Sequence, residues 1–132
     1  MSLHPIITQE APAAIGSYSQ AIQAGNTVYL SGQIPLDPKT MQLAQGIEAQ
    51  IACVFNNLSA VAHAAGASLA HIAKLTVYLT DLAHAPALNT YMASHFSLPY
   101  PARAVVGVAA LPRQALIEID AIAVVPSTPQ GA

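Results

Sequence analysis

Charged side chains are too scarce in this chain to cover the surface of a solitary domain. Lysine, arginine, aspartate and glutamate make up 8% of its 132 residues, whereas about 25% is usual for soluble domains. Apolar residues account for 54% of the chain. Because a monomer of this size needs surface charge to stay soluble, we expect much of the surface to be buried against further copies of the same chain.

The length is that of one domain, and we expect a single domain over residues 1–132 with a core at about 5–125. Residues 126–132 are rich in proline, glycine and small polar residues and are predicted to fray. The formal net charge of −2 offers no electrostatic footprint for nucleic acid. Neither a signal-peptide pattern nor a run of ~18 apolar residues is present, which predicts a cytoplasmic protein with no membrane partner.

Apolar periodicity predicts two helices and five strands. Residues 47–65 carry apolar side chains at helical spacing up to Gly66, and residues 85–96 form a second such segment with Pro86 in its first turn. Strands rich in β-branched, aromatic or alternating apolar residues are predicted at 19–24, 27–31, 74–80, 102–108 and 116–125. This order predicts an α+β fold, in which one sheet carries both helices on a single face and a neighbouring subunit covers the other face.

Arg103 is the most informative single residue. It is one of four basic side chains, and it lies in the apolar stretch 101–108. A dry, unpaired guanidinium would cost several kcal/mol, so an anion should meet it. If the last two strands pair as a hairpin, alternation brings Arg103 beside Glu118 or Asp120. Two interpretations then stay open. Arg103 forms a structural ion pair, or it binds a ligand carboxylate through two hydrogen bonds while Glu118 transfers protons or orients water.

Other chemistry-bearing residues give weaker signals. The five histidines form no pattern typical of a metal site, so no metal is expected. Cys53 is the only cysteine and has no histidine placed beside it in sequence, which favours a plain small side chain over a nucleophile. Tyr18 and Asn89 are compatible with ligand contacts or with ordinary half-buried and solvated roles. Gly32, near a strand end, indicates a close approach to the backbone.

Five segments in order resemble the RidA/YjgF family of small trimeric deaminases. The resemblance covers roughly residues 5–125. Its segments are Ala11-Pro-Ala-Ala-Ile-Gly-Ser-Tyr-Ser-Gln20, Ser31-Gly-Gln-Ile-Pro35, Lys74-Leu-Thr-Val-Tyr-Leu-Thr-Asp81, Pro101-Ala-Arg103 and Leu116-Ile-Glu-Ile-Asp-Ala-Ile-Ala123.

This resemblance implies a chorismate-mutase-like α+β fold and a homotrimer whose three sites lie between subunits. It also implies hydrolysis of reactive 2-imino and enamine acids, such as 2-iminopropanoate and 2-iminobutanoate, to 2-oxo acids and ammonia. No cofactor is implied. The implied catalytic residues are Arg103, which binds the substrate carboxylate, and Glu118, which positions water. The implied substrate-binding residues are Tyr18, Ser31, Gly32, Asn89, Arg103 and Val105.

The chain departs from the family pattern at two places. Val105 occupies a position where many members have cysteine, and it can replace that residue only if the backbone does the work. The stretch 89–101 is also shorter by one or two residues than in familiar members, which bears on Asn89. An alternative function is a non-catalytic trimer that binds small carboxylates or proteins. RNA cleavage is disfavoured because four basic residues are too few for a phosphate track.

Overall fold

A computed structural model describes residues 2–126 of the chain. One six-stranded sheet carries the two helices, α1 (Ile47–Ala64) and α2 (Ala85–His95). Short 3-10 turns lie at η1 (Leu69–His71), η2 (Leu82–His84) and η3 (Pro112–Gln114). The strands are β1 (Leu3–Ile6), β2 (Ala21–Ala24), β3 (Thr27–Gln33), β4 (Ile72–Leu79), β5 (Ala102–Gly107) and β6 (Ile117–Val124).

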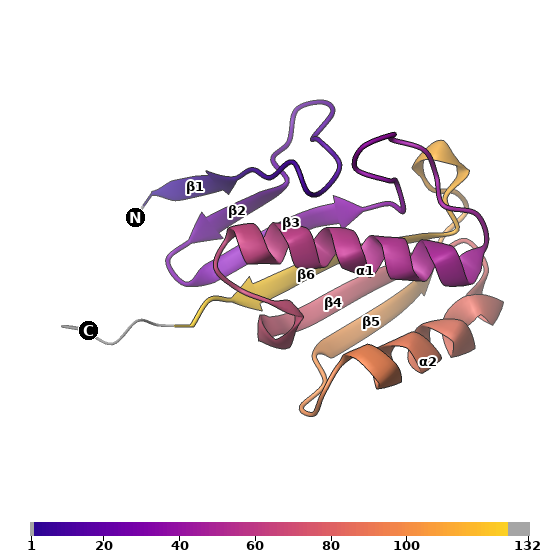
Figure 1. The fold of residues 1–132 in the computed structure, drawn as a ribbon. Coiled ribbons are helices and arrows are strands. Elements are labelled where there is room, and N and C mark those ends of the chain that lie inside the picture. The colour runs from indigo at the N-terminus through magenta and orange to yellow at the C-terminus, as the bar shows by residue number, and fades with distance from the viewer. Residues whose placement is uncertain (1, 127–132) are drawn as a thin grey trace.

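The strand order across the sheet is β1-β2-β3-β6-β4-β5. The last strand of the chain, β6, therefore lies in the middle, antiparallel to both β3 and β4. β5 runs parallel to β4 at the sheet edge, and α2 lies in the crossover between them. Figure 1 shows both helices on the same face of the sheet, which confirms the predicted α+β layer. We call the opposite face, which neither helix covers, the open face.

The core fills the layer between α1 and the central strands. Alternate residues of β6 are buried under the helices, and β4 contributes Leu75, Val77 and Leu79 in the same way. The apolar stripe of α1 packs onto them, as its periodicity predicts. Gly66, with φ of 85°, follows the end of the helix. The largest fully buried side chains are Phe55, Ile51, Leu58, Leu75, Leu79, Leu88, Ile117, Ile119, Val28, Val54, Val61 and Val77.

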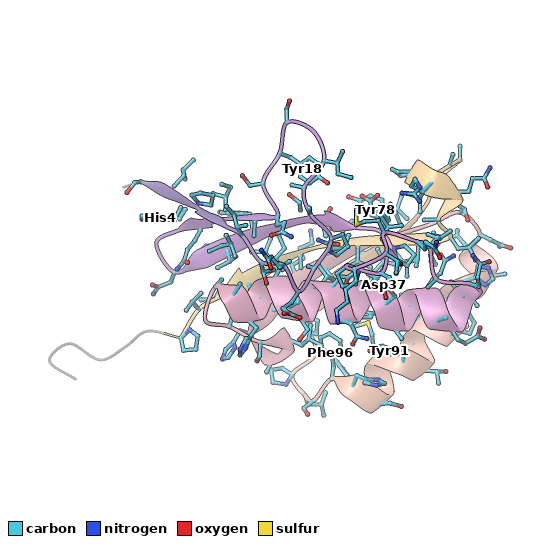
Figure 2. The ribbon with its side chains drawn as sticks, turned by 45° about the horizontal axis from the view of Figure 1, so that its top comes forward. His4, Tyr18, Asp37, Tyr78, Tyr91 and Phe96 are labelled. Atoms are coloured by element: carbon cyan, nitrogen blue, oxygen red, sulfur yellow. The ribbon has the colours of Figure 1, made fainter. Side chains whose placement is uncertain are left out.

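Phe55 joins the two helices. Its ring stacks on Tyr91 at a centroid distance of 5.0 Å and meets the edge of Phe96 at 5.4 Å. Figure 2 shows Tyr91 and Phe96 in the layer between α1 and α2. We expect Phe55→Ala to lower the free energy of unfolding by about 3–5 kcal/mol, because it empties a ring-sized volume and removes both contacts. Urea unfolding followed by circular dichroism measures this loss, and a change below ~1 kcal/mol would contradict the account.

The structure departs from the sequence analysis at two points. The last two strands do not form a hairpin, because β4 lies between β5 and β6. Arg103 is therefore not paired with Glu118 or Asp120, and the cross-strand arrangement considered for these residues does not occur within residues 2–126. β1 was not expected at all, since Leu-His-Pro-Ile has no alternating pattern and contains Pro5. Among the described strands it pairs with β2 alone, at the sheet edge where proline is tolerated.

Smaller differences concern element ends. β2 begins at Ala21 rather than residue 19, and β3 continues to Gln33 rather than ending at residue 31. Of the tail predicted to fray, residues 127–132 lie outside the described residues. No helix within residues 2–126 combines the length and apolar character needed to cross a membrane.

Candidate active site

Arg103 faces α2 from the edge strand β5. Its Nη1 donates a hydrogen bond to Asn89 Oδ1 at 2.7 Å and lies 3.6 Å from Met92 Sδ. Asn89 and Met92 are three residues apart and therefore adjoin on one side of α2. A cavity of about 370 Å³ opens beside the guanidinium, lined by Asn89, Met92, Ala93, Tyr100, Pro101 and Arg103. An amide oxygen thus orients the arginine without neutralising its charge.

The surroundings of Arg103 differ from the sequence expectation. The side chain is exposed rather than dry, because β5 is an edge strand. Nevertheless, no acidic side chain within residues 2–126 lies within ion-pair distance of it; its polar contacts are those to Asn89 and Met92. The guanidinium therefore has donors available for an anion that comes from outside these residues.

Glu118 lies on the other side of the sheet. Its neighbours along β6, Ile117 and Ile119, are fully buried under the helices, so Glu118 points to the open face. Its carboxylate lies against Gly32 of β3, where even a single added methyl group would overlap it. The register between β3 and β6 shifts between Leu30 and Gln33, which is the irregularity that presents Gly32 to Glu118. The close approach expected at this glycine is therefore observed.

The electrostatics of the open face favour a carboxyl group that can exchange protons. Partial burial raises the pKa of Glu118 above its ordinary value, and the negative charge of Asp120 raises it further. The Tyr78 hydroxyl donates to Asp120 Oδ2 at 2.9 Å, and this bond raises the tyrosine pKa. Tyr78 stands opposite Glu118 on the adjacent strand β4. Sequence reasoning did not single out Tyr78, although the shared parity of 118 and 120 was a usable signal.

Tyr18 and Ser31 lie near Gly32 but do different things. Tyr18 projects from the loop between β1 and β2, as Figure 2 shows, and is 52% exposed. Its hydroxyl accepts a hydrogen bond from Ile15 N at 3.3 Å. Tyr18 and Gly32 line one cavity of about 170 Å³. The Ser31 hydroxyl donates to Ser19 O at 2.5 Å, which ties the Tyr18 loop to β3.

Val105 lies on the same side of β5 as Arg103 and packs against the core. Because β5 has one strand neighbour within residues 2–126, half of its backbone groups have no sheet partner there. Cys53 is half-buried, and its Sγ lies 3.4 Å from Leu36 O. Burial, followed by the charge of Asp37, raises the pKa of this thiol, which disfavours the reactive thiolate.

The predicted residues therefore form two groups that the single chain does not bring together. Arg103, Asn89 and Val105 belong to the helix-covered side of the sheet edge, whereas Glu118 and Gly32 meet on the open face. In the sheet register, Arg103 aligns with Leu75 and Glu118 with Tyr78. The two residues are thus separated by two strand spacings, about 10 Å, and by three residues along the strands, about another 10 Å.

Comparisons with known proteins agree with the fold. A family model described as Endoribonuclease L-PSP matches residues 8–125. The protein DfrA of Myxococcus xanthus is 48% identical over 127 residues, which cover 94% of this chain and 97% of that protein. A 2-iminobutanoate/2-iminopropanoate deaminase of Dermatophagoides farinae is 43% identical over 121 residues, covering 91% and 94%. The crystal structure of RidA from Psychrobacter sp. PAMC 21119 superposes with a TM-score of 0.90 at 49% identity, covering 92% of this chain and 99% of that one.

These findings define the class of protein. It is a small α+β domain with one six-stranded sheet, two helices on one face and a candidate site divided between the two sides of that sheet. The chain belongs to the RidA/YjgF family. Some of its relatives are named as imine deaminases, and others carry only a family name.

Proposed function

We propose that this protein hydrolyses reactive 2-imino and enamine acids, such as 2-iminopropanoate and 2-iminobutanoate, to 2-oxo acids and ammonia. The observation that carries the proposal is the state of Arg103. Its guanidinium is oriented by Asn89 at 2.7 Å beside a cavity of about 370 Å³, with no acidic partner within residues 2–126. Relatives named as 2-iminobutanoate/2-iminopropanoate deaminases support the same reaction.

The complete site lies between two chains of a homotrimer in this proposal. Arg103 and Glu118 belong to opposite sides of one sheet, so a second copy has to bring a Glu118 to the cavity beside Arg103. The open face supports this arrangement because it carries exposed apolar side chains, Tyr29 at 52%, Val124 at 47% and Val106 at 42%. A neighbouring copy that covers them would also explain how so few charges suffice for solubility.

Arg103 binds the substrate carboxylate in this mechanism. The planar guanidinium donates two parallel charge-assisted hydrogen bonds, while Asn89 keeps the fork in one orientation. The unpaired backbone of β5 near Val105 is available to hydrogen-bond the imine nitrogen. Fixing both ends of a small planar substrate converts the reaction with water into an oriented encounter, which supplies much of the acceleration.

Glu118 from the neighbouring copy then activates water. Its carboxylate accepts a proton from water as the water oxygen bonds to the imine carbon, and it passes this proton to the nitrogen as the C=N double bond becomes a single bond. The carboxylate then takes the hydroxyl proton of the resulting carbinolamine and passes it to the nitrogen. The C–N bond breaks to release ammonia, and the C=O bond of the 2-oxo acid forms. The imine carbon is already electrophilic, so no covalent nucleophile is required.

The pH dependence follows from the raised pKa of Glu118. As the water-activating base, Glu118 is active when ionised, so kcat/KM falls as pH drops through its pKa, above the ordinary value of 4.5. Asp120→Asn removes the neighbouring negative charge, and we expect it to move this acid limb to lower pH. The pH profile of kcat/KM for variant and wild type measures the displacement, and a limb that stays in place or moves to higher pH contradicts the role of Glu118.

The function is tested by generating the imine with an amino acid oxidase and following ammonia and 2-oxo acid release. The wild-type protein should accelerate release well beyond the spontaneous rate, and heat-denatured protein should not. A protein that binds 2-oxobutanoate in calorimetry without accelerating release would instead be the non-catalytic carboxylate-binding trimer. If the protein neither accelerates the release of ammonia and 2-oxo acid nor binds 2-oxobutanoate, the deaminase function and the carboxylate-binding function are both overturned.

A further inference from the structure

The cavity of about 170 Å³ that Gly32 lines is also lined by a cationic side chain, Arg113, which has no role in the proposed mechanism. Its walls come from the Tyr18 loop, from the end of β3 with the segment after it, and from η3, which contributes Arg113. We propose that this cavity receives the side chain of the substrate. Arg113 would bind a carboxylate at the end of that side chain. The substrate class would then include 2-imino dicarboxylic acids, and the inference rests on the proposed imine hydrolysis.

Gly32 connects this cavity to the chemistry. Gly32 lines the cavity, and the Glu118 carboxylate lies where a side chain at Gly32 would be. In this proposal the water that Glu118 activates lies beside Gly32, which is one wall of the cavity. A substrate whose imine carbon meets this water can extend its side chain into the cavity, while its own carboxylate stays with Arg103 of another copy.

Arg113 is held in place by its backbone and by one hydrogen bond. Arg113 and Gln114 both adopt left-handed backbone conformations, with φ of 60° and 61°, which are unusual for residues other than glycine. Arg113 Nη2 donates to Met41 O at 3.1 Å, and Met41 is also left-handed, with φ of 59°. Two of these three left-handed residues, Met41 and Arg113, line the cavity and are joined by this hydrogen bond.

The charge of Arg113 is not compensated nearby. No acidic side chain within residues 2–126 pairs with it, and the hydrogen bond to Met41 O uses one of its five N–H donors. The remaining donors match a carboxylate, which can accept two of them in parallel. A substrate with a neutral side chain would not pair with these donors. A second carboxylate on the substrate is therefore the feature that this cavity would select.

The rest of the cavity suits a short carbon chain. Apart from Arg113, Tyr18, Gln20 and Gln33, its lining is apolar or glycine: Pro12, Ala13, Ile15, Gly32, Ile34, Leu36 and Met41. Its volume of about 170 Å³ corresponds to that of five or six water molecules in the liquid. Two methylene groups and a carboxylate fit this space, which points to the five-carbon imine formed by oxidation of glutamate.

The test compares three imines generated in situ from alanine, norvaline and glutamate. The norvaline product has the same main-chain length as the glutamate product but lacks the second carboxylate. We expect Arg113→Gln to reduce kcat/KM for the glutamate-derived imine about ten- to a hundredfold, the effect of losing hydrogen bonds to a charged group. Activity on the other two imines should change less than twofold. Lys39→Gln is the control, since it removes one positive charge from a loop residue outside the cavity lining.

The possible results separate this inference from the proposed function. Equal losses on all three imines, or no loss on any, would overturn the role of Arg113 while imine hydrolysis itself stands. If the wild type hydrolyses no imine, the proposed function fails, and calorimetry then decides about the cavity. Tighter binding of 2-oxoglutarate than of 2-oxopentanoate, lost in Arg113→Gln and kept in Lys39→Gln, supports a dicarboxylate site; equal binding of the two acids overturns it.

Discussion

Replacing Arg103 with alanine will lower kcat/KM for 2-iminopropanoate by about a hundred- to ten-thousandfold. The change removes two charge-assisted hydrogen bonds to the substrate carboxylate, each of which contributes about 1.5–3 kcal/mol. It also removes the orientation that holds the imine carbon beside water. Arg103→Lys keeps the charge, but an ammonium group cannot reproduce the planar fork that Asn89 orients, so it too should lose most activity.

The measurement is the rate of ammonia release from an imine generated in situ. Arg103 is exposed and forms no ion pair within residues 2–126, so both variants should keep wild-type circular dichroism and thermal stability. Lys39→Gln again controls for the loss of one positive charge. Turnover by Arg103→Ala within threefold of the wild type would remove this arginine from the reaction.

Adding a single methyl group at Gly32 should cause the second large loss of kcat/KM. In Gly32→Ala the new Cβ would overlap the Glu118 carboxylate, which must then move away from its position on the open face. Because displacements of about 1 Å cost on the order of a hundredfold in an oriented reaction, we expect kcat/KM to fall by at least that factor. Substrate binding should suffer less than turnover, since Arg103 is untouched.

Gly107→Ala is the matched control for this substitution. Gly107 is likewise a strand glycine without a left-handed backbone, and its added Cβ would meet the flexible Leu82 side chain at 3.2 Å instead of a carboxylate. Gly107→Ala should therefore retain activity within a few-fold, with a small change in stability. If both alanine variants lose activity equally, the effect is a general response of the sheet; if neither does, the contact between Gly32 and Glu118 does not govern the reaction.

Local patterns in the sequence were sufficient for the helices and the layer architecture. The apolar spacing in α1 identifies its buried stripe through Val54, Phe55 and Leu58, which are all fully buried. Parity along β5 and β6 correctly places Arg103 with Val105, and Glu118 with Asp120. These properties depend on residues close in sequence, where helix and strand periods act directly.

The pairing of the strands could not be predicted from such local patterns. Adjacent strands in sequence favour a hairpin, yet β6 pairs with β4, which lies nearly forty residues earlier and has an alternation of buried residues that matches β6. The choice depends on burying Ile117 and Ile119 beneath α1, a long-range condition that no local pattern states. For the same reason the sequence did not identify the neighbours of Arg103, since Asn89 and Met92 come from α2.

Only part of the candidate site could be predicted from the sequence, for a related reason. Gly32 carried a local signal, but its partner Glu118 follows from the irregular register between β3 and β6. The roles of Tyr78 and Arg113 depend on side-chain contacts made across the fold, to Asp120 and to Met41 O. Such contacts are set by tertiary packing and backbone conformation rather than by the spacing of residue types.

The central claim is that one chain supplies Arg103 and a neighbouring chain supplies Glu118 to each site. It is tested most directly by mixing Arg103→Ala with Glu118→Gln, two variants expected to be inactive alone, under conditions that let subunits exchange. In a randomly mixed homotrimer built by cyclic symmetry, about a quarter of the sites would combine an intact Arg103 with an intact Glu118. We expect imine hydrolysis to return to about that fraction of the wild-type rate. If mass spectrometry shows mixed oligomers and no activity returns, the two residues do not meet across a subunit boundary and the account is wrong.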